Sequence, residues 1–197
     1  SDQLDTRTKI LTETWKLMED QRGQNVHMSD IAQAVGISRQ AVYLHFPSRT
    51  DLIVATVQYV DEVKGFNARM AELETITSAL ELLDAAIEVW GNYIPETYGL
   101  AKVMLKARDT DEAMAAGWEN CMGCLREACQ AIIDALDNKG ILAPVWTPPE
   151  AVDLLWSLFS IDNWEQLTIE CGWSQAEYIA GLKTVSKRAF VEEAAGI

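Results

Sequence analysis

The chain has 197 residues, of which 16 are basic, 30 are acidic and 49% are hydrophobic, and its formal net charge is −14. This length can bury a substantial core as one large or two small domains, and this composition excludes global disorder. No segment approaches the roughly 20 consecutive apolar residues of a membrane-spanning helix, which excludes a transmembrane protein. Because no secretion signal is visible and four cysteines do not make a disulfide framework, we expect a cytoplasmic protein without a membrane partner.

The charge is distributed unevenly along the chain. Residues 1–50 carry six basic and six acidic residues, whereas residues 51–197 carry ten basic and 24 acidic residues. A strongly acidic surface is repelled by nucleic-acid phosphates, so the total charge argues against DNA binding. The neutral N-terminal segment weakens that objection, although it does not by itself indicate a DNA-binding function.

The apolar residues recur at helical spacing from end to end, and no segment has a convincing strand pattern. Gly23 and Asn25 are predicted to end the first helix, and Gly36 is predicted to end the second as a left-handed cap. Ser29 and Ser38 are predicted to cap the starts of the second and third helices. We expect an all-α fold of nine helices, at residues 1–21, 29–35, 38–46, 48–71, 78–90, 95–107, 109–140, 147–172 and 174 onward.

Residues 28–49 have the pattern of a helix-turn-helix, because two short predicted helices are joined by a turn at residues 36–38. Val42 and Phe46, four residues apart, can face the core, so the N-terminal part of the second helix is free to meet base edges in the major groove. Arginine can pair with guanine and glutamine with adenine. An ordinary helical hairpin has the same spacing and remains the alternative at this point. The outward-facing side chains are Arg39, Gln40 and Tyr43.

This segment resembles the DNA-binding region of the TetR (tetracycline-repressor) family. The most specific part is Ala41-Val-Tyr-Leu-His-Phe46, followed by Ser48-Arg-Thr-Asp-Leu52. The family pattern there is a small residue, an apolar residue, Tyr, any residue, His or Tyr, and Phe, and then a polar turn that leads to a Leu. Beyond the first three helices, only the length and the number of helices agree with the family.

The resemblance implies a homodimer of nine-helix chains that binds double-stranded DNA through its first three helices. It also implies a dimer interface on the last two helices and a pocket for a small-molecule effector among the middle ones. Pro47 departs from the Lys that the family often has there, which removes one phosphate partner. The DNA-binding residues that follow, base contacts and backbone contacts together, are Ser29, Ser38, Arg39, Gln40, Tyr43, His45 and Arg49.

Large aromatic residues and methionines are frequent in the acidic C-terminal part, where they can line an adaptable apolar pocket. Each of them taken singly is as well explained by an ordinary core position. Asp84, Glu88 or Glu119 could supply a negative group, which would favour a flat or lipophilic cation. The predicted ligand-binding residues are Glu88, Trp90, Tyr93, Met104, Trp118 and Met122.

The last two predicted helices each carry a stripe of large apolar residues that needs a covering surface. We assign this stripe to the dimer interface, and the alternative is packing within the same chain. The predicted interface residues are Trp156, Phe159, Tyr178, Leu182 and Val185.

The cysteines could make the protein respond to a metal ion or to thiol chemistry instead of a small-molecule effector. Cys121 and Cys124 could share one face of a helix, and a thiol such as Cys171 could complete a zinc or copper(I) site. Buried small thiols are the other explanation, because a CxxC pair within a helix is a weak signal without a second pair. We therefore expect no metal and no cofactor, and we keep a thiol- or metal-sensing regulator as an alternative.

No arrangement typical of an enzyme is visible: both histidines fall in the N-terminal segment, and there is no glycine-rich phosphate loop. A helical interaction protein that does not bind DNA is the more serious alternative. The sequence predicts a DNA-binding domain at residues 1–47 and a ligand-binding and dimerisation domain at residues 48–197. The predicted function is a repressor that binds a palindromic operator as a homodimer and is released by a small aromatic or lipophilic molecule.

Overall fold

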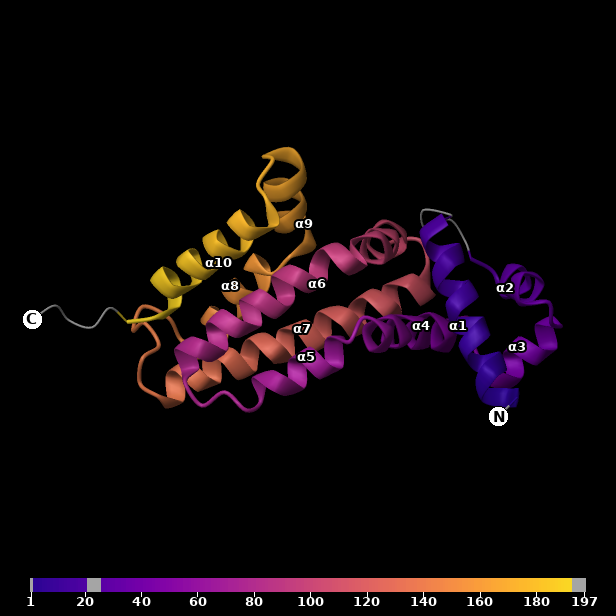
Figure 1. Cartoon of the computed structure of the whole chain (residues 1–197), viewed down its shortest axis with the longest axis horizontal. Coiled ribbons are helices and arrows are strands. Elements are labelled where there is room, and N and C mark those ends of the chain that lie inside the picture. Colours follow the sequence, from indigo (N-terminus) through magenta and orange to yellow (C-terminus); the bar gives the residue numbers. More distant parts are fainter. Residues whose placement is uncertain (1, 21–25, 193–197) are drawn as a thin grey trace, which may run out of the picture. The chain divides into compact units, whose positions relative to one another are not determined.

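The computed structural model of the chain describes residues 2–20 and 26–192, with side chains from residue 5 onward in the first helix. This part of the chain is all-α, as predicted (Figure 1). Its only β-type pairing is an isolated bridge between Leu142 and Val191. The helices are α1 (Asp2–Asp20), α2 (Met28–Val35), α3 (Arg39–His45), α4 (Arg49–Val63), α5 (Phe66–Leu73), α6 (Ala79–Ala107), α7 (Glu112–Asn138), α8 (Pro148–Leu158), α9 (Ile161–Glu165), the π-helical turn η1 (Gln166–Glu170) and α10 (Gln175–Phe190).

The ends of the N-terminal helices are set by capping residues. Gly36 adopts φ +78°, the left-handed conformation predicted for the cap that ends α2. The Ser38 hydroxyl accepts a hydrogen bond from the Ala41 amide at the start of α3, as predicted. The prediction that Ser29 caps α2 is wrong, because the helix already begins at Met28 and the Asp30 carboxylate accepts from the His27 amide. The predicted end of α1 at Gly23 and Asn25 lies outside the described residues.

Two predicted helices are divided in the structure. The segment expected as one helix over residues 48–71 stops at Val63, and Gly65 adopts φ +67° before α5 begins. The segment expected over residues 147–172 stops at Leu158, because Ser160 caps a new helix by accepting from the Asn163 amide. In both places a local backbone signal interrupts an apolar periodicity that would otherwise continue.

Two other predicted helices are joined. Pro95 was expected in the first turn of a new helix, but α6 runs through it from Ala79 to Ala107. A proline inside a helix has no amide hydrogen to donate to the carbonyl four residues earlier, which is that of Gly91. The side-chain amide of Gln175 in α10 donates to this carbonyl instead. The lost hydrogen bond is replaced from 84 residues away, so the helix continues.

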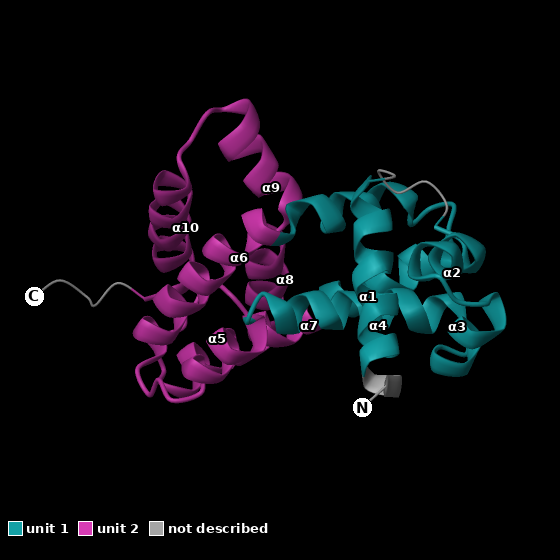
Figure 2. Cartoon of the chain, turned by 45° about the vertical axis from the view of Figure 1, so that its right-hand side comes forward, with its two compact units in different colours: residues 1–65, 97–122 teal, residues 66–96, 123–197 magenta. Residues whose placement is uncertain are grey.

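The described helices pack into two compact units (Figure 2). Unit 1 contains residues 1–65 and 97–122, and unit 2 contains residues 66–96 and 123–197. The division crosses α6 and α7, so these packing units differ from the predicted functional boundary at residue 47, which stays a prediction. No helix in the described ranges is long and apolar enough to cross a membrane.

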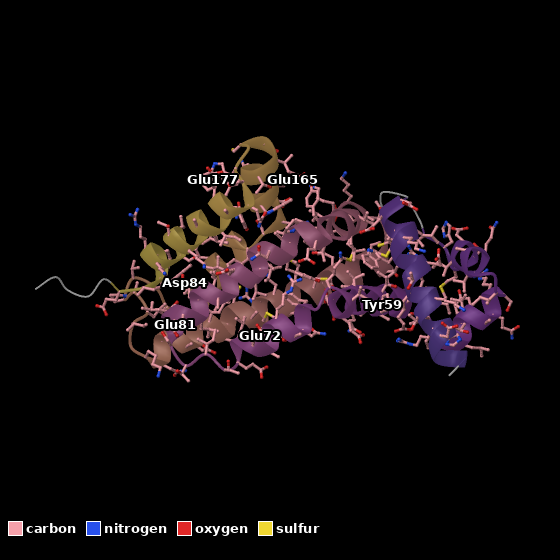
Figure 3. All side chains as sticks on the ribbon, in the orientation of Figure 1. Tyr59, Glu72, Glu81, Asp84, Glu165 and Glu177 are labelled. Carbon is pink, nitrogen blue, oxygen red and sulfur yellow. The ribbon has the colours of Figure 1, made fainter. Side chains whose placement is uncertain are left out.

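One apolar core joins the parts of unit 1. It contains residues from α1 to α4, such as Ile10, Ile31 and Leu52, together with Met104 near the end of α6 and Met114 at the start of α7. At the edge of this core the hydroxyls of Thr12 in α1 and Tyr59 in α4 share a hydrogen bond of 3.2 Å (Tyr59 is labelled in Figure 3). The helix-turn-helix is therefore built on the same core as the turn between α6 and α7.

In unit 2, α10 lies along the first half of α6. Lys183 forms an ion pair with Glu88 at 2.8 Å, and Lys187 forms one with Asp84, which Figure 3 labels. Gly91 has no side chain where Ile179 of α10 approaches, and an added Cβ would lie 2.5 Å from the Cγ1 atom of Ile179. The close approach of these two helices therefore depends on a glycine.

Candidate DNA-binding surface

Helix α3 has one buried and one exposed face, as the spacing predicted. Val42 and Phe46 are buried in the core of unit 1. Arg39, Gln40 and Tyr43 are exposed on the opposite side. The buried face holds the helix in place, so the exposed side chains are presented from a fixed backbone.

Arg39 and Tyr43 are arranged by contact with each other. They lie four residues apart on α3, and an Arg39 Nη2 hydrogen donates to the Tyr43 hydroxyl at 3.3 Å. The guanidinium carbon also lies 5.5 Å from the centre of the tyrosine ring, a cation–π distance. The pair limits the rotamers of two long side chains before any DNA is met, which lowers the entropy cost of binding.

The remaining predicted residues of the helix-turn-helix have different environments. Ser29 is exposed on α2, and its hydroxyl donates to Asp30 at 3.4 Å. His45 is half-buried at the end of α3. Ser38 is exposed, but its hydroxyl oxygen already accepts the Ala41 amide as a helix cap. Any phosphate contact by Ser38 would therefore use its hydroxyl as a donor.

Arg49 is held inside the protein in this conformation. Its Nε donates to the Val26 carbonyl at 2.6 Å, and its Nη1 donates to Asp111 at 2.5 Å. Its Nη2 is buried and makes no hydrogen bond within the described part of the chain. None of the three nitrogens is presented to DNA here, although the resemblance implied a phosphate contact.

Leu44 is an exposed residue of α3 that the sequence did not single out. Its side chain is 83% exposed, the most exposed of the large apolar residues described, and its neighbour Tyr43 is 38% exposed. Apolar side chains on a recognition helix can contact the thymine methyl group in the major groove. The available signal was that Leu44 falls outside the stripe of Val42 and Phe46, so the core does not account for it.

The predicted ligand-binding residues are divided between the two units. In unit 2, Glu88 pairs with Lys183, Trp90 stacks on Phe159 with ring centres 5.9 Å apart, and Tyr93 is buried. In unit 1, Met104 belongs to the core, whereas Trp118 and Met122 are half-buried. Glu119, one candidate for the negative group, is exposed. Their joint role in ligand binding stays a prediction.

The predicted dimer-interface residues have mixed exposure. Phe159, Tyr178 and Leu182 are buried within the core of their own unit. Trp156 is half-buried, and the guanidinium carbon of Arg126 lies 5.5 Å from its ring centre. Val185 is 50% exposed and is the one member with a large free surface. Their role in dimerisation also stays a prediction.

The cysteines do not gather with other potential metal ligands. Cys124 and Cys171 are exposed, Cys121 is half-buried, and Cys129 is buried. No group of three or more His, Cys, Asp or Glu side chains within the described ranges is placed to hold a metal ion. Burial raises the pKa of the Cys129 thiol to about 12, so that thiol is protonated and unreactive at neutral pH.

Comparison with known proteins supports a regulatory function. Residues 10–56 match the family model for bacterial regulatory proteins of the tetR family. The HTH-type transcriptional regulator CymR of Pseudomonas putida is 22% identical over 161 residues, which cover 80% of this chain and 75% of CymR. The HTH-type transcriptional regulator EthR of Mycobacterium tuberculosis (strain ATCC 25618 / H37Rv) is 26% identical over 141 residues, which cover 69% of this chain and 63% of EthR.

Two solved structures share the fold over nearly the whole chain. A protein from Saccharomonospora viridis in complex with choline has a TM-score of 0.74 at 20% identity and covers 96% of this chain and 99% of its own. NalD, the secondary repressor of the MexAB-OprM multidrug efflux pump in Pseudomonas aeruginosa, has a TM-score of 0.73 at 19% identity and covers 99% and 100%.

Proposed function

We propose that the chain is a DNA-binding transcriptional regulator of the TetR family that represses transcription as a homodimer on a palindromic operator, because residues 10–56 match the tetR family model and CymR is an HTH-type regulator. We further propose that a small molecule bound by residues outside the helix-turn-helix releases the dimer from DNA. The observation that carries the proposal is the exposed face of α3, where Arg39 and Tyr43 are arranged by mutual contact over a buried backbone.

A twofold dimer would place two copies of α3 about one helical turn of DNA apart, which matches an operator of two inverted half-sites. The proposed interface uses α8 and α10. Exposed Val185 and half-buried Trp156 lie on these helices and offer apolar surface to a second copy. Buried Phe159, Tyr178 and Leu182 would support this surface from within.

For the effector we propose a small aromatic or lipophilic molecule, with cations as the first class to test. Aromatic side chains attract cations through their ring faces, and acidic residues add electrostatic attraction. The structurally similar protein from Saccharomonospora viridis was solved with choline, a quaternary ammonium cation that aromatic ring faces can bind. The residues to test, in both units, are Glu88, Trp90, Tyr93, Met104, Trp118 and Met122.

The first experiment is selection of bound duplexes from a random DNA pool, followed by titration of the selected duplex at several salt concentrations. A palindromic duplex whose affinity falls steeply with salt is the expected result, because each phosphate contact releases counterions. A folded protein that enriches no duplex would contradict the proposal and favour a helical interaction protein.

The selected duplex then serves as the probe for the effector. We expect a member of a panel of aromatic and lipophilic cations, with choline included, to weaken operator binding, and operator DNA to weaken binding of that compound by the same factor. Trp118→Ala should shift the dose–response curve of that compound and leave operator affinity unchanged. An unaltered curve would remove Trp118 from the effector site.

A further inference from the structure

The side chain of Arg49 connects segments that are far apart in the sequence. It extends from the first turn of α4 and bonds to the carbonyl of Val26, which lies two residues before α2, and to the carboxylate of Asp111, which lies just before α7. Asp111 is 62 residues further along the chain. The side chain of Arg49 is 23% exposed and that of Asp111 is 8% exposed, so both charges are largely withdrawn from water.

The carboxylate of Asp111 is also the cap of α7. The same oxygen, Oδ1, accepts hydrogen bonds from the amides of Ala113 at 3.1 Å and Met114 at 3.3 Å. Burial by itself would raise the pKa of Asp111, but the hydrogen bond and the charge of Arg49 outweigh this effect, and the pKa falls below its usual range. The carboxylate is therefore ionised at neutral pH and contacts Arg49 and the first turn of α7 through the same oxygen.

The surrounding packing makes this contact sensitive to movement of α7. Gly117 lies against α4 and α6, because an added Cβ would be 3.1 Å from Ile53 of α4 and 3.2 Å from the sulfur of Met104 of α6. Packing this close does not absorb a displacement, so a shift of α7 is passed on to its neighbours. An open hollow of about 380 Å³ is lined by Arg49, Thr50 and residues 110–113, so this side of the ion pair is not covered by packed side chains.

We propose that Arg49 and Asp111 form a lock that sets the position of α2 and α3 relative to the turn between α6 and α7. Arg49 is then a positioning residue for DNA binding rather than a phosphate contact, and displacement of the α6–α7 turn changes operator affinity by opening the lock. This inference rests on the proposed operator binding and specifies how that binding is regulated.

The test compares Arg49→Gln, Asp111→Asn and the double variant with the wild type, using the selected operator. We expect each single variant to weaken operator binding at least about fivefold, the lower range of coupling between sites in proteins. The double variant should be no weaker than the worse single variant, because both substitutions remove the same contact. Arg69→Gln is the matched control, because it removes an arginine from an ion pair in unit 2, 2.8 Å from Glu96.

Salt dependence separates a lock from a phosphate contact. If Arg49 only positions the helices, the slope of log affinity against log salt stays at the wild-type value in all variants. If Arg49 binds phosphate, Arg49→Gln lowers the magnitude of that slope by about 0.9, and Asp111→Asn tightens binding by releasing the arginine. The second pattern would overturn the inference.

The second measurement is the affinity for operators whose half-sites are moved one base pair closer together or further apart. A variant that is only less stable would still prefer the same half-site spacing as the wild type. We expect the wild type to discriminate among these operators and the lock variants to discriminate less, while non-specific DNA binding is unchanged. If Arg49→Gln does not fold, Arg49→Lys replaces it, because lysine keeps the charge but lacks the two separate donor nitrogens that Arg49 uses. An operator bound equally by the wild type and all lock variants overturns the lock alone. A wild type that selects no operator overturns the proposed function, and with it the lock.

Discussion

Buried hydroxyl groups of the two units differ in whether they have a hydrogen-bond partner. In unit 1, Thr14 and Thr56 are fully buried, and each donates to the carbonyl four residues earlier at 2.7 Å. In unit 2, Ser186 is equally buried, but its hydroxyl has no hydrogen-bond partner within the described part of the chain. Unit 1, which carries the proposed DNA-binding surface, therefore satisfies these groups by local geometry, whereas unit 2 does not.

The contacts between helices differ in the same way. In unit 1 both partners of the pair of Arg49 and Asp111 are largely buried, whereas in unit 2 the pair of Lys183 in α10 and Glu88 in α6 has one partner, Glu88, whose side chain is 60% exposed. Exposed pairs contribute little to stability, whereas removal of one partner from a buried pair is costly. The difference indicates that loss of one partner is more costly in the pair of Arg49 and Asp111 than in the pairs between α6 and α10.

The largest effect on stability is expected from the buried ion pair. Asp111→Asn should lower the free energy of unfolding at neutral pH by about 3 kcal/mol, because Arg49 is left without its counter-charge. The pKa of Asp111 is lowered in the folded state, so its contribution is complete above the unfolded pKa near 4 and is lost as the pH falls through the folded value. Urea unfolding at pH 7 and at successively lower pH should show the variant and the wild type converging. A constant difference across that range would contradict the assignment.

A pair of glycine substitutions tests the α6–α10 contact. Gly91→Ala should destabilise the protein by about 2 kcal/mol, because the new Cβ would meet Ile179 in a packed core. Gly123→Ala is the control in α7, where nothing lies within 4 Å of the added carbon, and it should stabilise by about 0.5–1 kcal/mol through helix propensity. Equal changes in thermal unfolding for both variants would mean that α10 does not constrain α6 at Gly91.

Substitutions on the exposed face of α3 should change DNA binding without changing stability. Arg39→Ala is expected to weaken operator binding by about 1–2 kcal/mol, the range of one good base contact. Tyr43→Ala should weaken operator binding to a similar extent, because the two side chains position each other. Leu44→Ala should cost less and should affect only operators with a thymine at the contacted position. Thermal unfolding is the control, and parallel losses of stability and binding would indicate a structural role.

The smallest effects test the buried hydroxyls directly. Thr56→Ser keeps the hydroxyl and measures the loss of a methyl group, and Thr56→Ala should cost about 1 kcal/mol more through loss of the hydrogen bond to Leu52. Ser186→Ala should be neutral or slightly stabilising, because its hydroxyl gives up water on folding without gaining a partner among the described residues. A cost for Ser186→Ala equal to that of the Thr56 hydroxyl would remove the contrast between the units.

Local signals in the sequence predicted most of the N-terminal part correctly. The cap at Ser38, the left-handed Gly36 and the buried pair of Val42 and Phe46 each depend on residues within one or two helical turns. The boundaries that were wrong depend on competing signals. Gly65 and Ser160 interrupt helices whose apolar periodicity continues beyond them.

The candidate site shows the same limit. The exposed positions of Arg39, Gln40 and Tyr43 follow from helical spacing, and the mutual contact of Arg39 and Tyr43 follows from their separation of four residues. The partner of Arg49 could not be predicted in this way. Asp111 looks like any other acidic residue of an acidic chain until the fold brings it to α4.

The sequence by itself determined the fold class, the helix-turn-helix and the resemblance to the TetR family, because helical periodicity and capping are local and the motif occupies one continuous segment. The features that depend on long-range contacts were decided by the tertiary structure. There Arg49 is hydrogen-bonded to Asp111, and α6 continues through Pro95 because the side-chain amide of Gln175 is supplied from a distant helix. The physical reason is that a charged or polar group that leaves water on folding needs a partner, and folding brings that partner from a distant part of the chain. The spacing of neighbouring residues along the sequence does not identify this partner.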